Sequence, residues 1–201
     1  VCPYKPVPQT KEYLKYKVRV FGSQGGHSGD DINKNRVNAN QMLMRFLYKV
    51  LDKHNIELYE IDGGNKRNAI AREASAVVAI PARSENDVIA LFNRFVKEIE
   101  SEYHTTDPDV TGFAEPLPAR KEAIDTATSR RLILALASAP HGVLAMSGDI
   151  KGLVETSSNL ASIKMLPGGR IRVGSSQRSA INSARKAAGA KFEAVFELAG
   201  A

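Results

Sequence analysis

Alternating apolar and basic residues predict a strand near the start of the chain. From Leu14 to Val20 apolar residues alternate strictly with lysine or arginine, the period at which successive side chains point to opposite faces of a sheet. Apolar residues then recur at helical spacing from Ala39 to Val50, which predicts a helix. The three prolines of residues 1–10 argue against a central strand there, so we expect an extended connector.

Two more strands, a helix and a final strand complete a β-α-β-β-α-β unit. Residues 56–61 and 69–80 predict strands joined by a glycine-containing reversal, because glycine tolerates positive φ. Apolar residues recur at helical spacing over 88–99, and residues 110–114 are strand-like. This order is typical of a ferredoxin-like α+β fold, with helices against one face of an antiparallel sheet. We therefore predict a first subdomain over residues 11–118.

The second half predicts a partial repeat of the same plan. A helical run covers residues 124–137, and a hairpin of strands 154–166 and 169–176 surrounds a Pro-Gly turn. A closing helix over 181–199 has one apolar stripe. We expect residues 119–201 to form a second α/β subdomain. Because no strand follows the closing helix, we expect this subdomain to be truncated at its C-terminus.

Composition bounds the class of protein. The 201 residues carry a formal net charge of +6, but lysine and arginine are scattered without a concentrated run, which indicates a solvated surface rather than a nucleic-acid site. The single Cys2 cannot form an internal disulfide, and no apolar stretch approaches the roughly 20 residues of a membrane helix. We expect a cytoplasmic protein with neither a membrane nor a nucleic-acid partner.

No internal metal site or nucleophile motif is evident. The sequence has no His-x-Asp, His-x-x-x-His or Cys-x-x-Cys pair, and no Gly-x-Ser-x-Gly elbow. The glycine-rich residues 22–29 match neither the P-loop nor the dinucleotide spacing. We therefore expect no metal bound by this chain alone. The four histidines lie far apart in sequence: His27, His54, His104 and His141.

Several ordered motifs resemble one enzyme family. Gly25-Gly26-His27-Ser28-Gly29, ahead of a helix with Asn38-Ala39-Asn40, resembles the lid or dimerisation domain of aminoacyl-histidine dipeptidases. These Xaa-His, carnosinase-like dipeptidases are two-zinc metallopeptidases of the aminoacylase and carboxypeptidase superfamily. The resemblance runs through nearly all of the chain, although Ala71 stands where the family often has proline. Further motifs follow in the family's order: Arg67-Asn68-Ala69-Ile70, Lys151-Gly152-Leu153-Val154-Glu155-Thr156-Ser157 and Ser175-Ser176-Gln177-Arg178-Ser179.

The resemblance implies that the zinc-binding catalytic residues and the substrate-binding lid belong to different domains. In such enzymes a catalytic domain of the same polypeptide holds the zinc ions and the general base, and the lid closes over a dipeptide substrate. Zinc is thus implied for the parent enzyme, and a second copy of the lid is a further possible partner. By motif, His27 would donate a hydrogen bond to the reacting carbonyl oxygen. Arg178 would bind the substrate's terminal carboxylate, and Asn68 would add an amide to that recognition. The lid alone is expected to be inactive.

Each of these residues also has a simpler interpretation. His27 in a glycine turn is a candidate cap of the following helix, and Arg178 is a candidate surface arginine at a strand end. The Asn68 side chain would satisfy the backbone of its own turn. A competing function is a stand-alone ferredoxin-like module for binding RNA or a small ligand, or for oligomerisation. The absence of aromatic residues from strand 69–80 weighs against RNA, whose bases stack on such residues.

Overall fold

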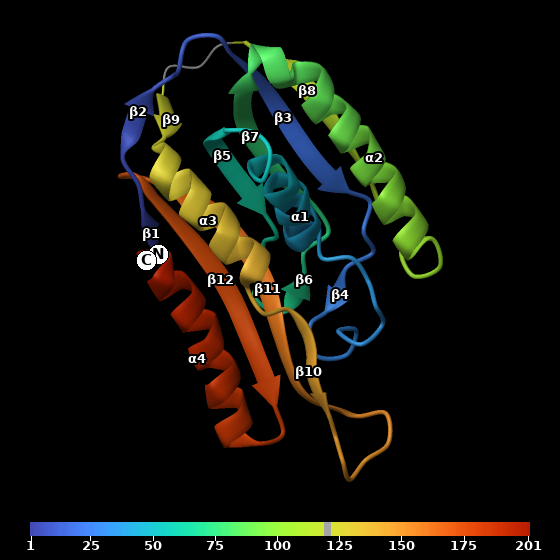
Figure 1. Ribbon diagram of the computed structural model, residues 1–201. Helices are drawn as coiled ribbons and strands as arrows, with labels where there is room; N and C mark the ends of the chain where they lie inside the picture. Colours follow the sequence, from blue (N-terminus) through green and yellow to red (C-terminus); the bar gives the residue numbers. More distant parts are fainter. Residues whose placement is uncertain (119–121) are drawn as a thin grey trace.

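One antiparallel sheet organises the chain. The computed structural model describes residues 1–118 and 122–201, and within them the sheet runs β1-β12-β11-β5-β7-β3-β8, with β10 paired to β11 (Figure 1). Two ribbons, β2–β9 and β4–β6, lie outside it. The elements are β1 (Cys2–Pro3), β2 (Pro6–Pro8), β3 (Tyr13–Phe21), β4 (Gly26–His27), α1 (Ala39–Leu51), β5 (Glu57–Gly63), β6 (Ala69–Ile70), β7 (Ala74–Pro81), the 3-10 turn η1 (Ala82–Ser84), α2 (Glu85–Tyr103), β8 (Thr111–Leu117), β9 (Glu122–Ile124), α3 (Thr126–Ser138), β10 (Gly142–Met146), β11 (Val154–Leu166), β12 (Arg170–Ser179) and α4 (Asn182–Leu198).

The first half has the predicted ferredoxin-like order. Strands β5, β7, β3 and β8 are neighbours and all pair antiparallel, with α1 and α2 in the connections. The α+β fold with an antiparallel sheet is therefore confirmed. The predicted strand 69–80 was wrong in one respect, because it is split at Ala71. Exposed Arg72 and Glu73 break its apolar run, and residues 69–70 leave the sheet to pair with β4.

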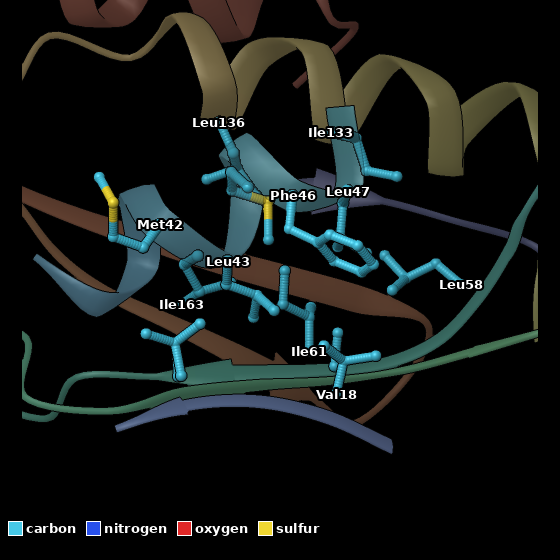
Figure 2. Packing of buried hydrophobic residues seen from close by; sticks show 14 of the residues in the cluster. Val18, Met42, Leu43, Phe46, Leu47, Leu58, Ile61, Ile133, Leu136 and Ile163 are labelled. Atoms are coloured by element: carbon cyan, nitrogen blue, oxygen red, sulfur yellow. The ribbon is translucent and has the colours of Figure 1, made fainter. Parts of the chain in front are cut away.

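Helix α1 lies at the centre of the core. Asn38 caps it, since its side chain accepts from the backbone N–H groups of Asn40 and Gln41. Figure 2 shows the apolar side of α1 against sheet residues such as Ile61 and Ile163, with α3 packed on the other side of α1. The four helices of the described residues all contribute to this one cluster, so they cover the same face of the sheet. The ribbon β2–β9 covers part of the opposite face, over a small cluster around Tyr59 and Val77.

The two halves share the sheet and the core. Strand β11 pairs with β5 at Ile163 and Gly63, which joins the second half directly to the first. The predicted hairpin is present as β11 and β12, but the sequence did not indicate β10, which pairs with the edge of β11 that faces β5. The proline-rich residues 1–10 form β1 and β2, short edge strands where a missing N–H is tolerated. Helix α3 begins later than predicted because Ile124 belongs to β9 and Asp125 caps the helix.

Candidate functional site

The loop between β3 and α1 carries His27 and is tied down at both of its ends. Asp107 is fully buried, and its carboxylate accepts hydrogen bonds from the backbone N–H of Gln24 at 2.6 Å and of Val37 at 2.8 Å. Ser23 Oγ lies 2.9 Å from the same carboxylate. A carboxylate accepts such bonds strongly because it is ionised. Asp107 therefore fixes the two stems of the loop that presents His27.

Inside this loop a second carboxylate holds the backbone of His27. The backbone N–H of His27 donates to Asp31 Oδ2 at 2.7 Å, and the backbone N–H of Asp31 donates back to His27 O at 2.9 Å. The hydrogen bond from the Lys34 ammonium and the one from the His27 N–H hold the pKa of the Asp31 carboxyl below its usual range. Gly26 adopts a φ of +136°, and a Cβ there would collide with the Asp31 side chain, so only glycine fits.

The imidazole of His27 lies between the guanidinium of Arg178 and the carboxylate of Asp30. Its Nε2 is 3.3 Å from Arg178 Nη2, and its Nδ1 is 2.9 Å from Asp30 Oδ2. A guanidinium N–H only donates, so Nε2 is the acceptor in the contact with Arg178. Nδ1 lies close to the Asp30 carboxylate but makes no hydrogen bond to it. The His27 side chain is 40% exposed. It is therefore oriented by its neighbours and still open to a ligand.

Arg178 reaches His27 from the other end of the sequence. It is exposed on β12, directly opposite Ser157 of β11, and Ser157 is opposite Val143 of β10. Residues opposite one another in antiparallel strands share a face of the sheet. Gly29 lies against the pair and leaves room for both side chains, because a Cβ there would lie 3.1 Å from His27 Cε1 and 3.2 Å from Arg178 Nη1. Two residues 151 positions apart thus meet at one exposed point.

Asn68 lies beside His27 on the neighbouring strand. Its backbone carbonyl accepts from the N–H of Ser28 at 2.9 Å, and the next residue, Ala69, pairs with His27 in the β4–β6 ribbon. The Asn68 side chain is exposed. It lines an open cleft of about 550 Å3 together with His27 and ten other residues: Gly26, Asp62, Gly64, Asn65, Lys66, Ala69, Ile70, Ala71, Arg72 and Glu73.

Part of the chain matches a known protein family. Residues 9–107, which carry His27 and Asn68, match the family model described as the peptidase dimerisation domain. The chain is 30% identical over 186 residues to the cytosol non-specific dipeptidase of Escherichia coli (strain K12), a match that covers 92% of this chain and 38% of that protein.

A solved structure resembles the dimerisation domain and also the residues after it. The aminoacylhistidine dipeptidase of Vibrio alginolyticus superposes with a TM-score of 0.94 at 33% identity, over 98% of this chain and 40% of that one. The chain thus spans about two fifths of the length of both dipeptidases. Arg178 lies beyond residues 9–107.

The structure rules out the helix-cap interpretation of His27 and places two further residues, Asp30 and Asp31, at the site. His27 does not cap a helix in this dimerisation domain, because the next helix starts at Ala39 and is capped by Asn38. Asp30 and Asp31 were missed by sequence reasoning. Their only signal is their place directly after the glycine-rich residues 22–29, which is common for acidic surface residues.

The acidic residues of the described chain do not form a metal centre. Residues 1–118 and 122–201 include no group of three or more His, Cys, Asp or Glu side chains placed to hold a metal ion. His27 and Asp30 are only a pair, so a zinc centre does not fit the residues of the dimerisation domain alone. None of the helices in these two ranges is long and apolar enough to span a membrane.

Proposed function

We propose that this chain is the lid of a zinc-dependent cytoplasmic dipeptidase that hydrolyses aminoacyl-histidine and related dipeptides. Both similar proteins are dipeptidases, which supports this reaction class. The zinc ligands are expected on a catalytic domain of the same polypeptide. The family's description as a dimerisation domain supports a second copy as a further partner.

The observation that carries the proposal is the meeting of His27 and Arg178 at an exposed point. A guanidinium presents parallel N–H groups that match both oxygens of a carboxylate. In a dipeptide the reacting carbonyl and the terminal carboxylate are separated by a single residue, and adjacent Cα atoms are about 3.8 Å apart. A guanidinium that binds the terminal carboxylate only 3.3 Å from the imidazole therefore suits a dipeptide better than a long peptide.

His27 and Arg178 would act in sequence. A substrate carboxylate that binds Arg178 withdraws the guanidinium from His27 Nε2. With the guanidinium withdrawn, Nε2 is free to carry the imidazole's own proton and to donate it in a hydrogen bond to the oxygen on which negative charge develops. The Asn68 amide, on the rim of the same cleft, adds a hydrogen bond to the bound peptide.

Substitutions in the full-length polypeptide that carries this segment test the roles separately. His27→Ala should lower kcat about 10²–10³-fold, the usual effect of removing one oxyanion donor. His104→Ala, an exposed histidine near the end of α2, is the matched control and should keep normal turnover. Unchanged kcat in His27→Ala would remove His27 from the mechanism.

A substrate change tests Arg178 independently. The wild-type enzyme should bind a dipeptide amide, which lacks the terminal carboxylate, much more weakly than the free dipeptide. Arg178→Met should lose affinity for the dipeptide but show little further loss for the amide, because both changes remove the same interaction. If the loss of affinity from Arg178→Met and the loss from the amide substrate add fully, Arg178 does not contact the carboxylate. The 201-residue chain alone, supplied with Zn²⁺, should hydrolyse neither substrate.

A further inference from the structure

Asn159 connects the second half of the chain to the loop that carries Asn68. It lies on β11 and is 1% exposed. Its Nδ2 donates to Ala69 O at 2.8 Å and to Arg67 O at 3.2 Å, the two carbonyls on either side of Asn68. Its Oδ1 is buried without a hydrogen-bond partner among the described residues. The side chain therefore acts on this loop through its N–H groups.

Within the described residues, backbone pairing between this loop and β11 is short, and the side chain of Lys164 on β11 also bonds Asp62 of β5 at 2.8 Å. The pairing between β5 and β11 has one register pair within the described ranges, Ile163 with Gly63, and the β4–β6 ribbon is two residues long. The loop nevertheless packs directly on β11, because a Cβ at Gly64 would collide with Ala161 O. Asn159 supplies two hydrogen bonds at the place where backbone pairing ends.

The same strand also positions Arg178. Asn159 and Ser157 are two residues apart with no register shift between them, so they share a face of the sheet. Ser157 is directly opposite Arg178 on β12. On the other side, Ala69 pairs with His27. Asn159 thus lies where the strand beside Arg178 meets the ribbon that carries His27 and Asn68.

We propose that Asn159 is a positioning residue that fixes Asn68 relative to the His27–Arg178 pair. It touches no substrate and acts through the carbonyls of Arg67 and Ala69. Only a primary amide of this size can donate to both carbonyls from a buried position. The proposal rests on the proposed function for its effect on catalysis, but its effect on the loop is independent of that function.

Asn159→Asp tests the proposal with little change of shape. The aspartate sets an oxygen against two carbonyl oxygens and removes both hydrogen bonds, which predicts roughly 10-fold or faster hydrogen exchange at the loop. The amide to observe is that of Ser28, which donates to Asn68 O. In the full-length enzyme we expect kcat/KM to fall by about 10²-fold, with much of the loss in KM, as for a misplacement of about 1 Å.

Asn40→Asp is the matched control. Asn40 is also fully buried, and its Nδ2 also donates to a carbonyl of β11, that of Leu160 at 3.3 Å, but from helix α1. It should leave the exchange of the Ser28 amide and kcat/KM within about twofold of wild type. If Asn159→Asp does not fold, Asn159→Ser removes the same two bonds without adding a charge.

The two readouts separate the possible failures. Unchanged exchange at Ser28 in both Asn159 variants, or equal acceleration by Asn40→Asp, would overturn the positioning role. Faster exchange with unchanged kcat/KM would support the positioning role and reject substrate binding by Asn68. Faster exchange with a raised KM supports both.

Discussion

Replacing Asp107 with asparagine should loosen the loop that carries His27. The buried carboxylate accepts from the backbone N–H groups of Gln24 and Val37, one at each oxygen. Asparagine has nearly the same shape but only one oxygen, so its NH2 group must face one of these two N–H donors. Whichever way the amide turns, one stem of the loop loses its hydrogen bond.

The size of the effect follows from these contacts. A hydrogen bond to a charged group contributes about 1.5–3 kcal/mol, and the bond that remains is weakened because the new side chain is neutral. We therefore expect Asp107→Asn to lower the free energy of unfolding by about 2–4 kcal/mol. With a urea m-value of about 2 kcal/mol/M, the unfolding midpoint should fall by about 1–2 M.

Urea unfolding followed by circular dichroism and tyrosine fluorescence measures this change, since the chain has six tyrosines and no tryptophan. Asp109→Asn is the matched control, because Asp109 is exposed and lies two residues away. Its free energy of unfolding should change by less than about 0.5 kcal/mol. A midpoint within about 0.3 M of wild type for Asp107→Asn, with an unchanged m-value, would show that the carboxylate does not hold the loop.

Two further predictions concern His141 and Gly29. Burial lowers the pKa of His141 from its ordinary 6.5 to about 4, so the unfolded chain takes up a proton before the folded chain does. The free energy of unfolding should therefore fall by about 2 kcal/mol from pH 7 to pH 5, measured by urea unfolding, and His141→Gln should remove this dependence. Gly29→Ala should push His27 and Arg178 apart and lower kcat/KM of the full-length enzyme on the order of 10-fold. Gly189→Ala, in the open interior of α4, should instead keep kcat/KM and add up to about 1 kcal/mol of stability; equal activity of the two variants would count against the Gly29 argument.

Local pattern predicted the long elements well, because each buries one face or one stripe. The alternation from Leu14 to Val20 became β3, and the helical spacing from Ala39 to Val50 became α1. The two-residue strand β4 was not predicted, and β6 was predicted only as the start of the longer strand 69–80, since pairs such as Gly26–His27 contain too few residues to show a period. Strand β10 was missed for a similar reason: it has five residues, with two irregularities of register.

The amino-acid sequence by itself determined the secondary-structure order and the candidates His27, Arg178 and Asn68, through short-range spacing and family-like motifs. Only the tertiary structure decided that His27 and Arg178 lie 3.3 Å apart, with Asp30 behind the imidazole. It also decided that Asn159 binds the carbonyls beside Asn68. Such contacts depend on sheet order and strand register, which are set by packing between distant segments and leave no periodic trace along the chain.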